Sequence, residues 1–442
     1  MGLQNQLFSC SEPSLYHQPG QRGYFSVLTR KDGDRARQKS YPIEKLDWII
    51  ENLDPNIDSW VSQAEFFKPN RRLVNLLRLQ LCFVDLDTHK AAIGNHPPQE
   101  QARALRFFCD SEGIPQPSLI LFSGRGLHAK WLLDSPLPRQ ALIRWNAVQK
   151  VLVEKLAPLG ADPGAKDASR VLRIENTINT KSGERVRVLD VDPGKNGPNR
   201  WCFETLCLEV LPIDRRELRS KKFKVIKGNP NITGLHQFSG RQLAWDRLQD
   251  LRTLAELRDG VPEGERTLNL HWRLNFLLLS GATNSTLMFH EAAELAREFC
   301  PDWAFVKSEL STLYAKAKAF ERGEKVTCNN KLYSPLYTPK NAHLIDLFDI
   351  SAEEESKLKT IISKDEKNRR KREKQNQENR NKGMVSREQY EAQSLSRQKP
   401  WEVLGMSRSG WYAQGKPTAK TGAWTGLNVL QGEAPKKALD KS

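Results

Sequence analysis

Apolar and polar positions follow two rhythms over the first half of the chain. Short apolar runs that alternate with polar residues are typical of strands, whereas apolar residues spaced three and four apart are typical of helices. Glycine and proline clusters separate these segments, as expected for turns. The pattern predicts strands at 22–30, 77–87 and 171–179, a hairpin at 117–133, and helices at 41–53, 97–113 and 138–159. A mixed α and β domain is therefore expected over residues 20–210.

The second half of the chain reads as helical, after a basic connector at 215–231 without apolar periodicity. Wide apolar stripes predict a helix bundle, because such stripes must be buried against neighbouring helices. After the stripes the chain first loses and then regains apolar content. This pattern predicts a bundle at 236–325, a short helical unit at 336–363, a basic linker at 364–385, a helical unit at 386–417 and a disordered tail at 418–442.

Charge narrows the choice of partner. The chain has 442 residues, with 69 Lys and Arg against 53 Asp and Glu, a net charge of +16. Such an excess favours a polyanionic partner, and nucleic acid is preferred because no basic amphipathic helix with a strong apolar face stands out. No apolar run is long enough to span a bilayer, so no membrane is expected. The seven cysteines form no C-x-x-C pair, which favours a reducing, cytoplasmic location.

Two acids end the apolar strand LCFVDLD. Alternation places Asp85 and Asp87 on one face of that strand, with Val84 and Leu86 on the other. Two close carboxylates repel each other unless a cation lies between them, and hard cations such as Mg²⁺ or Mn²⁺ prefer carboxylate oxygens. A pair of solvated acids at a strand end is the simpler interpretation of this feature taken alone.

The turn of the predicted hairpin is SGRGLH, residues 123–128. Its glycines allow the backbone to approach a ligand closely, and Arg125 can bind phosphate oxygens in bidentate fashion. His128 can donate to a phosphate oxygen, and Lys130 lies on the same face of the outgoing strand. An ordinary hairpin turn with a surface arginine is the alternative.

A third acid lies in the turn ADPGAKDASR, residues 161–170. Asp162 is the first candidate, and Asp167, five positions later, is a rival that the sequence leaves open. Basic residues follow closely, so the acid is either part of a salt-bridge network or a metal ligand beside phosphate-binding cations. The basic residues are Arg170, Arg173, Lys181 and Arg185.

Taken together and in this order, the three elements resemble the motifs of the archaeo-eukaryotic primase superfamily, within it the primase-polymerases of plasmids, phages and other mobile elements. Its hydrophobic-Asp-hydrophobic-Asp motif matches residues 84–87, and its Ser-Gly-x-Gly-x-His motif matches residues 123–128. Its third motif, an Asp before a basic stretch, is best matched by Asp162, and Asn179 stands where the family often has His or Asn. The resemblance covers roughly residues 20–205. The helices at 236–325 resemble, at the level of pattern, the helical domain that often follows.

This resemblance implies an α+β fold with an RRM-like antiparallel sheet, and two-metal nucleotidyl transfer that synthesises primers on single-stranded DNA from nucleoside triphosphates. Asp85, Asp87 and Asp162 would hold Mg²⁺ or Mn²⁺ and form the catalytic set together with His128. Lys130 and Arg170 would contact DNA. The triphosphate and its sugar would meet Ser123, Gly124, Arg125, Gly126, His128, Arg173, Asn179 and Lys181.

The segment 386–417 resembles a helix-turn-helix unit. Ser407 can cap its second helix, which places Arg408 and Ser409 at the start of a recognition helix for duplex DNA. A small helical hairpin with a tryptophan core is the alternative. The chain contains no G-x-x-x-x-G-K-[ST] motif, so a separate helicase and a replicative polymerase are expected as partners.

Two other functions would also explain part of the pattern. A metal-dependent nuclease of the TOPRIM type uses an Asp-x-Asp pair too, but requires a glutamate on an earlier strand, and neither Glu51 nor Glu65 lies on a convincing one. A non-catalytic replication initiator would bind DNA without needing the acids. Loss of activity on changing Asp85 separates an enzyme from such an initiator.

Overall fold

The computed structural model describes residues 11–17, 20–31, 33–211, 230–328, 331–381, 391 and 394–416. Most of the predicted basic connector and all of the predicted tail lie outside these residues. The chain divides into two compact units, Met1–Ser363 and Lys364–Ser442. Over the described part of the chain, no helix combines the length and the apolar character that a bilayer span requires.

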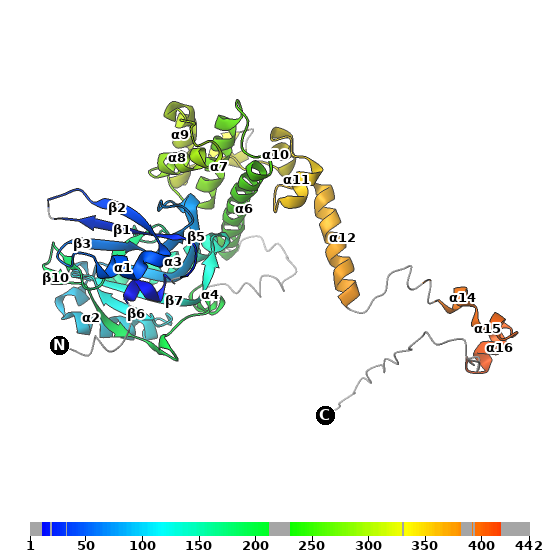
Figure 1. Cartoon of the computed structure of the whole chain (residues 1–442), viewed down its shortest axis with the longest axis horizontal. Coiled ribbons are helices and arrows are strands. Elements are labelled where there is room, and N and C mark those ends of the chain that lie inside the picture. Colours follow the sequence, from blue (N-terminus) through cyan, green and yellow to red (C-terminus); the bar gives the residue numbers. More distant parts are fainter. Residues whose placement is uncertain are drawn as a thin grey trace. The chain divides into compact units, whose positions relative to one another are not determined.

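A large antiparallel sheet forms the centre of the first unit (Figure 1). Within the described residues it has nine strands in the order β11-β6-β7-β5-β4-β1-β3-β8, with β2 paired to β1. The predicted α+β class with an antiparallel sheet is confirmed. The strands are β1 (Tyr24–Arg30), β2 (Arg37–Pro42), β3 (Asp58–Ser62), β4 (Ala64–Phe66), β5 (Leu76–Leu86), β6 (Leu119–Phe122), β7 (Leu127–Pro138), β8 (Val171–Arg173) and β11 (Arg187–Val191).

The sheet forks where β3 passes into β4. β1 pairs with both, through Val27 opposite Val61 and Tyr24 opposite Phe66. Gln63 interrupts the strand, and its backbone N–H donates to the carbonyl of residue 170 at 2.9 Å. Beyond this point β3 continues to β8, whereas β4 continues to β5. The strand that carries the acid pair and the strand that ends at Arg173 are therefore the two branches of one fork.

Beyond the end of β4, no strand among the described residues borders that edge of β5, and side chains of helix α3 (Leu142–Lys155) pair it instead. The indole of Trp145 donates to the carbonyl of Leu81 at 2.8 Å. The amide of Gln149 accepts from the N–H of Phe83 at 2.9 Å and donates to its carbonyl at 3.0 Å. Buried backbone groups left unpaired are costly, so these side chains allow β5 to extend to Leu86.

Further helices cover the sheet and complete its core. The three predicted helices are present with shorter bounds, and the first of them starts later because 37–42 forms a strand before it. They are α1 (Leu46–Glu51), α2 (Pro98–Ser111) and α3. Helix α4 (Phe203–Val210) and a short 3₁₀ helix at the start of the described chain, η2 (Glu12–Leu15), were not predicted. The buried β5 residues pack with Trp145, Val148 and Leu152 of α3 in one continuous hydrophobic core.

After α4 the first unit is mainly helical and, among its described residues, includes a short hairpin of β14 (Val326–Cys328) and β15 (Lys331–Tyr333). α6 and α7 pack along each other, and Trp245, Leu248, Leu274 and Leu277 are buried in this cluster. The helices are α6 (Pro230–Leu257), α7 (Arg266–Ser280), α8 (Met288–Phe299), α9 (Ser311–Glu321), α10 (Asn341–Leu347) and α11 (Ala352–Lys357). The last two belong to the same body, because the buried Asp250 carboxylate of α6 accepts three backbone N–H groups from residues 359–361 at 2.6 to 2.8 Å.

The helical bundle is fixed to the loop that leads into β5. Glu291 of α8 accepts the N–H groups of Leu73 at 3.4 Å and Val74 at 3.2 Å. Glu294 accepts from the side chain of Asn70 at 2.6 Å, and Arg252 of α6 donates to the carbonyl of Val74 at 2.9 Å. The bundle therefore determines the path of the chain immediately before β5.

The second unit contains a solvated helix and a small helical pair. No residue of α12 (Lys364–Asn381) is buried, as its composition predicts. α14 (Leu395–Gln398), α15 (Pro400–Val403) and α16 (Arg408–Ala413) follow. Ser407 accepts from the N–H of Gly410 at 3.1 Å, which caps α16 as predicted. The rings of Trp401 and Trp411 lie 5.9 Å apart and form the core between α15 and α16.

The Glu291 clamp makes the stability of the first unit depend on pH. Burial raises the pKa of Glu291 from 4.5 to about 6, against the opposing effect of the two backbone N–H groups. An acid with a raised pKa stabilises the fold fully below its unfolded pKa, and this stabilisation is lost as the pH rises through its folded pKa. We expect wild type to lose about 2 kcal/mol relative to Glu291→Gln between pH 4.5 and pH 7.

Urea unfolding of both proteins at several pH values measures this difference. Glu353→Gln, at an exposed position in the first turn of α11, is the matched control and should follow wild type at every pH. Parallel curves for wild type and Glu291→Gln would contradict the expectation.

Candidate active site

A pocket of about 580 Å³ lies at the fork of the sheet, where the end of β5, β8 and the β6–β7 turn meet. Most of the predicted site residues line it. A residue of the helical bundle, Leu287, also contributes to its wall. The predicted residues in the lining are Asp85, Asp87, Ser123, Arg125, His128, Arg170, Arg173, Asn179 and Lys181, and the further ones include Trp60, Arg71, His89, Asp167 and Ser169.

The acid pair occupies the end of β5 as the alternation predicts. The neighbouring Val84 and Leu86 are fully buried, whereas the side chains of Asp85 and Asp87 are 23% and 33% exposed. Burial raises the pKa of Asp85 to about 6; Arg170 opposes this, and the charges of Asp87 and Asp162 add to it. A carboxylate in such surroundings is stabilised by a proton or by a cation.

Asp162 is brought beside the acid pair by the open edge of β5. Its N–H donates to the carbonyl of Asp85 at 2.8 Å, and the N–H of Asp87 donates to the carbonyl of Gly160 at 2.8 Å. Its side chain accepts from Arg170 at 3.2 Å. Asp167, the rival third acid, lines the pocket instead. Asp162 is thus held against the backbone of Asp85 and Asp167 in the pocket wall, and the choice between them as third acid stays open.

The carboxylate oxygens of the acidic residues suit a hard cation, although these side chains are not gathered around a single point. Among the described residues, no three His, Cys, Asp or Glu side chains are placed to hold a metal ion together. Two of the acids are engaged by cations, Asp87 by Lys90 at 2.6 Å and Asp162 by Arg170 at 3.2 Å. Carboxylate oxygens are the ligands that Mg²⁺ and Mn²⁺ prefer, so the chemistry of Asp85 and Asp87 fits such an ion.

The SGRGLH turn is packed tightly against the end of β5. The N–H of Ser123 donates to the carbonyl of Gly126 at 2.9 Å, and its hydroxyl accepts from the N–H of Gly126 at 3.2 Å. A Cβ at Gly126 would overlap the carbonyl oxygen of Leu86, and one at Gly124, where φ is +92°, would clash with Asn179. Both glycines are therefore required by close approach, which leaves the exposed Arg125 at the rim of the pocket.

His128 lines the pocket and carries a buried ring nitrogen without a hydrogen-bond partner among the described residues. It stands opposite Asp85 in the β5–β7 register, and its Nε2 lies 3.6 Å from Asp85 Oδ1, too far for a hydrogen bond. Its Nδ1 is buried and has no partner among the residues that the structure describes. Burial holds the pKa of His128 well below its usual value, so the imidazole is neutral near pH 7. A buried polar atom without a protein partner can accept or donate a hydrogen bond to a bound ligand or water molecule.

Arg173 and the loop after β8 form the basic side of the pocket. The guanidinium of Arg173 lies 4.7 Å from the ring centre of Trp60 and donates to Asp58 at 2.5 Å. Asn179 is buried and donates to the carbonyl of Ser123 at 2.9 Å, while its own side-chain oxygen accepts from the N–H of Lys181 at 3.2 Å.

The sequence interpretation missed Trp60 and Arg71, which line the pocket, and Asp58, which pairs with Arg173 behind it. The segment DSWVS, residues 58–62, offered a usable signal, because a charged residue two positions before a tryptophan shares its face of a strand. Arg71 donates to the carbonyl of Ser169 and thereby joins the loop before β5 to the pocket wall.

The prediction that Lys130 contacts DNA is wrong for this fold. Its side chain is fully buried, and its ammonium group is paired with Glu12 at 2.6 Å and lies 3.3 Å from the hydroxyl of Tyr16. The face of the strand was predicted correctly, but the 3₁₀ helix η2 covers that face at this position. Lys130 is part of the core beside the pocket.

Arg408 and Ser409 lie at the start of α16 in the second unit, as predicted, and both are exposed. The guanidinium of Arg408 lies 5.5 Å from the ring centre of Trp401. The hydroxyl oxygens of Ser407 and Ser409 lie 3.3 Å apart. Both side chains are accessible to a partner, although α16 has only six residues.

Fold and site together define an α+β protein with an antiparallel sheet and a polar pocket in which acids stand opposite arginines, a combination suited to binding phosphates. No protein-family model matches the chain. A replication protein of Clostridium perfringens is 28% identical over 339 residues, which cover 77% of this chain and 75% of the relative.

Two solved structures to which the chain is similar are a primase-polymerase domain and the catalytic domain of a primase. The cyanophage S-2L primase-polymerase domain matches 45% of this chain and 94% of its own length, with a TM-score of 0.33 and 18% identity. The catalytic domain of primase RepB′, solved in complex with initiator DNA, matches 46% of this chain and 92% of its own length, with a TM-score of 0.29 and 12% identity.

The buried Lys130–Glu12 pair yields a test of the corrected role of Lys130. Lys130→Met leaves the Glu12 carboxylate buried without a counter-charge, and we expect a loss of about 3–5 kcal/mol in the free energy of unfolding. The double variant Lys130→Met/Glu12→Gln should recover much of this loss, because no uncompensated charge remains. Lys150→Met, which breaks an exposed pair with Glu154, should cost less than about 0.5 kcal/mol.

Urea unfolding at neutral pH measures all four proteins. A Lys130→Met protein of wild-type stability that binds single-stranded DNA less tightly would restore the original prediction of DNA contact.

Proposed function

We propose that this chain is a replication primase-polymerase that extends and initiates DNA strands on a single-stranded template by nucleotidyl transfer. The observation that carries the proposal is a single pocket that holds an acid pair, the SGRGLH turn and three basic side chains from another branch of the sheet. These basic residues are Arg170, Arg173 and Lys181. The name of the Clostridium perfringens relative, a replication protein, supports a role in replication. In this proposal the replicated DNA is that of a plasmid, phage or other mobile element.

In this proposal Asp85 and Asp87 hold Mg²⁺ or Mn²⁺, with Asp162 or Asp167 as the third ligand. Such ions would lower the pKa of an attacking hydroxyl and neutralise the leaving pyrophosphate. When the metal ion binds, the ion pair between Asp87 and Lys90 and the one between Asp162 and Arg170 would break. The side chains of Lys90 and Arg170 would stay beside the pocket and be available to phosphate groups.

The turn and the basic side bind the triphosphate of the incoming nucleotide. Arg125 at the rim and Lys181 from the facing loop would contact phosphate oxygens with charge-assisted hydrogen bonds. Neutral His128 would donate a hydrogen bond through whichever ring nitrogen carries its proton. Donors that lie beside the reacting phosphates would stabilise the charge that develops there in the transition state. Arg173, whose guanidinium lies 4.7 Å from the ring centre of Trp60, would contact the phosphate or the sugar.

The second unit would bind duplex DNA. The exposed basic helix α12 would attract the phosphate backbone, and Arg408 and Ser409 would meet the groove at the start of α16. Residues 364–383 carry nine basic and four acidic side chains. A separate helicase and a replicative polymerase would act with the chain.

Primer synthesis on single-stranded DNA with labelled nucleoside triphosphates, with and without Mn²⁺, tests the enzymatic proposal. Asp85→Ala and Asp87→Ala should each reduce incorporation at least ~100-fold, because each removes a ligand of the ion that offsets several kcal/mol of charge in the transition state. DNA binding should stay near wild type. Asp34→Ala, at an exposed loop position, is the control.

Full synthesis by the double variant Asp85→Ala/Asp87→Ala would refute the proposed active site. Degradation of the labelled template, without any synthesis and dependent on the same two acids, would favour the nuclease alternative. Origin binding that persists without either reaction would favour a non-catalytic initiator.

Removal of the second unit tests whether the first unit carries out synthesis and the second unit binds duplex DNA. A chain ending at Ser363 keeps the whole pocket and should retain synthesis on single-stranded templates. Its affinity for duplex DNA should fall and depend less on salt, because each lost phosphate contact removes about 0.9 from the log-log salt slope. Arg408→Ala in the full chain should weaken specific binding and leave the non-specific slope unchanged.

Gel-shift titrations at several salt concentrations compare the three proteins. Equal duplex affinity and an equal slope for the shortened chain would show that the second unit does not bind DNA.

A further inference from the structure

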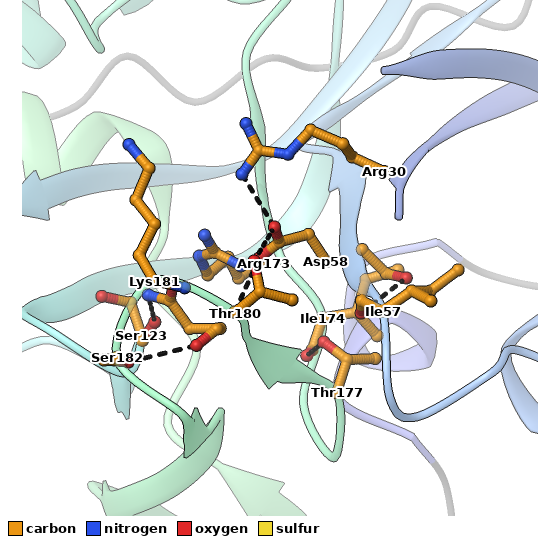
Figure 2. A network of polar contacts seen from close by, with 12 residues as sticks. Arg30, Ile57, Asp58, Ser123, Arg173, Ile174, Thr177, Thr180, Lys181 and Ser182 are labelled. Carbon is orange, nitrogen blue, oxygen red and sulfur yellow. Dashed lines mark hydrogen bonds and ion pairs between the residues drawn. The ribbon is translucent and has the colours of Figure 1, made fainter. Parts of the chain in front are cut away.

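A buried carboxylate lies behind the basic side of the pocket. Asp58, the first residue of β3, is fully buried, and Figure 2 shows two arginines and a threonine directed at it. It accepts from Arg30 at 2.7 Å and from Arg173 at 2.5 Å. The N–H of Thr180 donates to it at 3.2 Å and the hydroxyl of Thr180 at 2.6 Å. Four donors therefore converge on one side chain that does not itself line the pocket.

The register of three strands produces this convergence. Arg30 of β1 stands directly opposite Asp58 of β3, and Arg173 of β8 stands directly opposite Trp60 of β3. Asp58 and Trp60 share one face of β3 because they are two positions apart. The two guanidinium groups therefore reach the same carboxylate from strands on opposite sides of β3, and both lie over the ring of Trp60, at 5.5 Å and 4.7 Å.

The contacts of Asp58 continue into the pocket through the loop after β8. Thr180, which Asp58 holds by its backbone and its hydroxyl, lies between Asn179 and Lys181, and both of these line the pocket. Asn179 in turn donates to the carbonyl of Ser123. In Figure 2 the ammonium end of Lys181 extends away from the Asp58 network. One carboxylate thus fixes Arg173 directly and the phosphate-binding turn through two further residues.

The ionised form of Asp58 is the one that these contacts require. Burial by itself would raise the pKa of Asp58, but the hydrogen bonds from Thr180, Arg30 and Arg173 and the charge of Arg173 outweigh it and hold the pKa well below its usual range. Arg173 is itself mostly buried, so without this counter-charge its guanidinium would be left with the ring of Trp60 and without an ionic partner to direct it.

We propose that Asp58 is a positioning residue, which orients Arg173 and the 179–181 loop so that this side of the pocket receives the triphosphate of the incoming nucleotide. This inference rests on the proposed function, because it assigns a role within the same pocket. Asp58 acts through Arg173, Asn179 and Lys181 and does not contact the nucleotide itself.

Asp58→Asn tests the role, since it keeps the size of the side chain and removes its charge. We expect the dissociation constant for a nucleoside triphosphate, measured at equilibrium with Mn²⁺, to rise roughly 10- to 100-fold, the factor that corresponds to one charge-assisted contact. The KM for the nucleotide should rise by a similar factor, with a smaller change in kcat. Affinity for the nucleoside monophosphate should change less than about threefold, because the β and γ phosphates are absent.

Arg30→Ala is the matched control, because Arg30 contacts the same carboxylate but lies outside the pocket lining. It should change triphosphate affinity less than about threefold, although it also removes an ion pair from Asp58. Should Asp58→Asn fail to fold, Thr180→Val takes its place: it removes only the hydroxyl bond to Asp58, and a rise of about threefold to tenfold is expected for the triphosphate alone.

The outcomes separate this inference from the proposed function. A wild-type chain that neither binds nor incorporates nucleoside triphosphates overturns both. A wild type that binds and incorporates them, together with Asp58→Asn or Thr180→Val of unchanged triphosphate affinity, overturns the positioning role alone. Equal losses for triphosphate and monophosphate would assign Asp58 to general stability of the pocket and would likewise overturn it.

Discussion

The backbone of β5 has to find hydrogen-bond partners on both edges, and the rest of the site depends on how it does so. β7 pairs one edge throughout, but β4 is short and leaves the other edge open beyond residue 79. Helix α3 pairs Leu81 and Phe83, and residues 160–162 then pair Asp85 and Asp87. The need to satisfy buried amide and carbonyl groups thus brings an acid from a distant loop to the end of the strand that carries two others. The repulsion between these carboxylates is unfavourable, but the backbone pairing holds them near one another nonetheless.

Local pattern was sufficient for the parts of the site that lie within one strand or one turn. The apolar run ending in Asp85 and Asp87 predicted both the strand and the face of its acids, and the glycines of SGRGLH predicted a tight turn between β6 and β7. Such features depend on residues close in sequence, where alternation and backbone sterics decide the geometry. Helix positions were also recovered, with ends displaced by a few residues.

Features that require several distant strands to meet were not predictable in this way. Asp58 matters because Arg30 and Arg173 flank it, and that arrangement depends on the order of β1, β3 and β8 in the sheet. The error at Lys130 has the same origin. Alternation predicted correctly on which face of the strand Lys130 lies. Its partner Glu12, however, lies 118 positions earlier in the chain, and the periodicity of a strand does not indicate which segment will cover one of its faces.

The contact between α8 and the loop before β5 bears on how such a chain can be divided or recombined. Leu287 contributes to the pocket wall, and the carboxylates of Glu291 and Glu294 hold residues 70–75, which lead straight to the acid pair. A border drawn after the last strand of the sheet, near residue 210, would therefore remove part of the pocket wall and release the chain that enters β5. Exchange of the sheet domain alone between related proteins would require matching partners on α8. The part of the chain that can be exchanged as one unit, with its pocket intact, extends to Ser363.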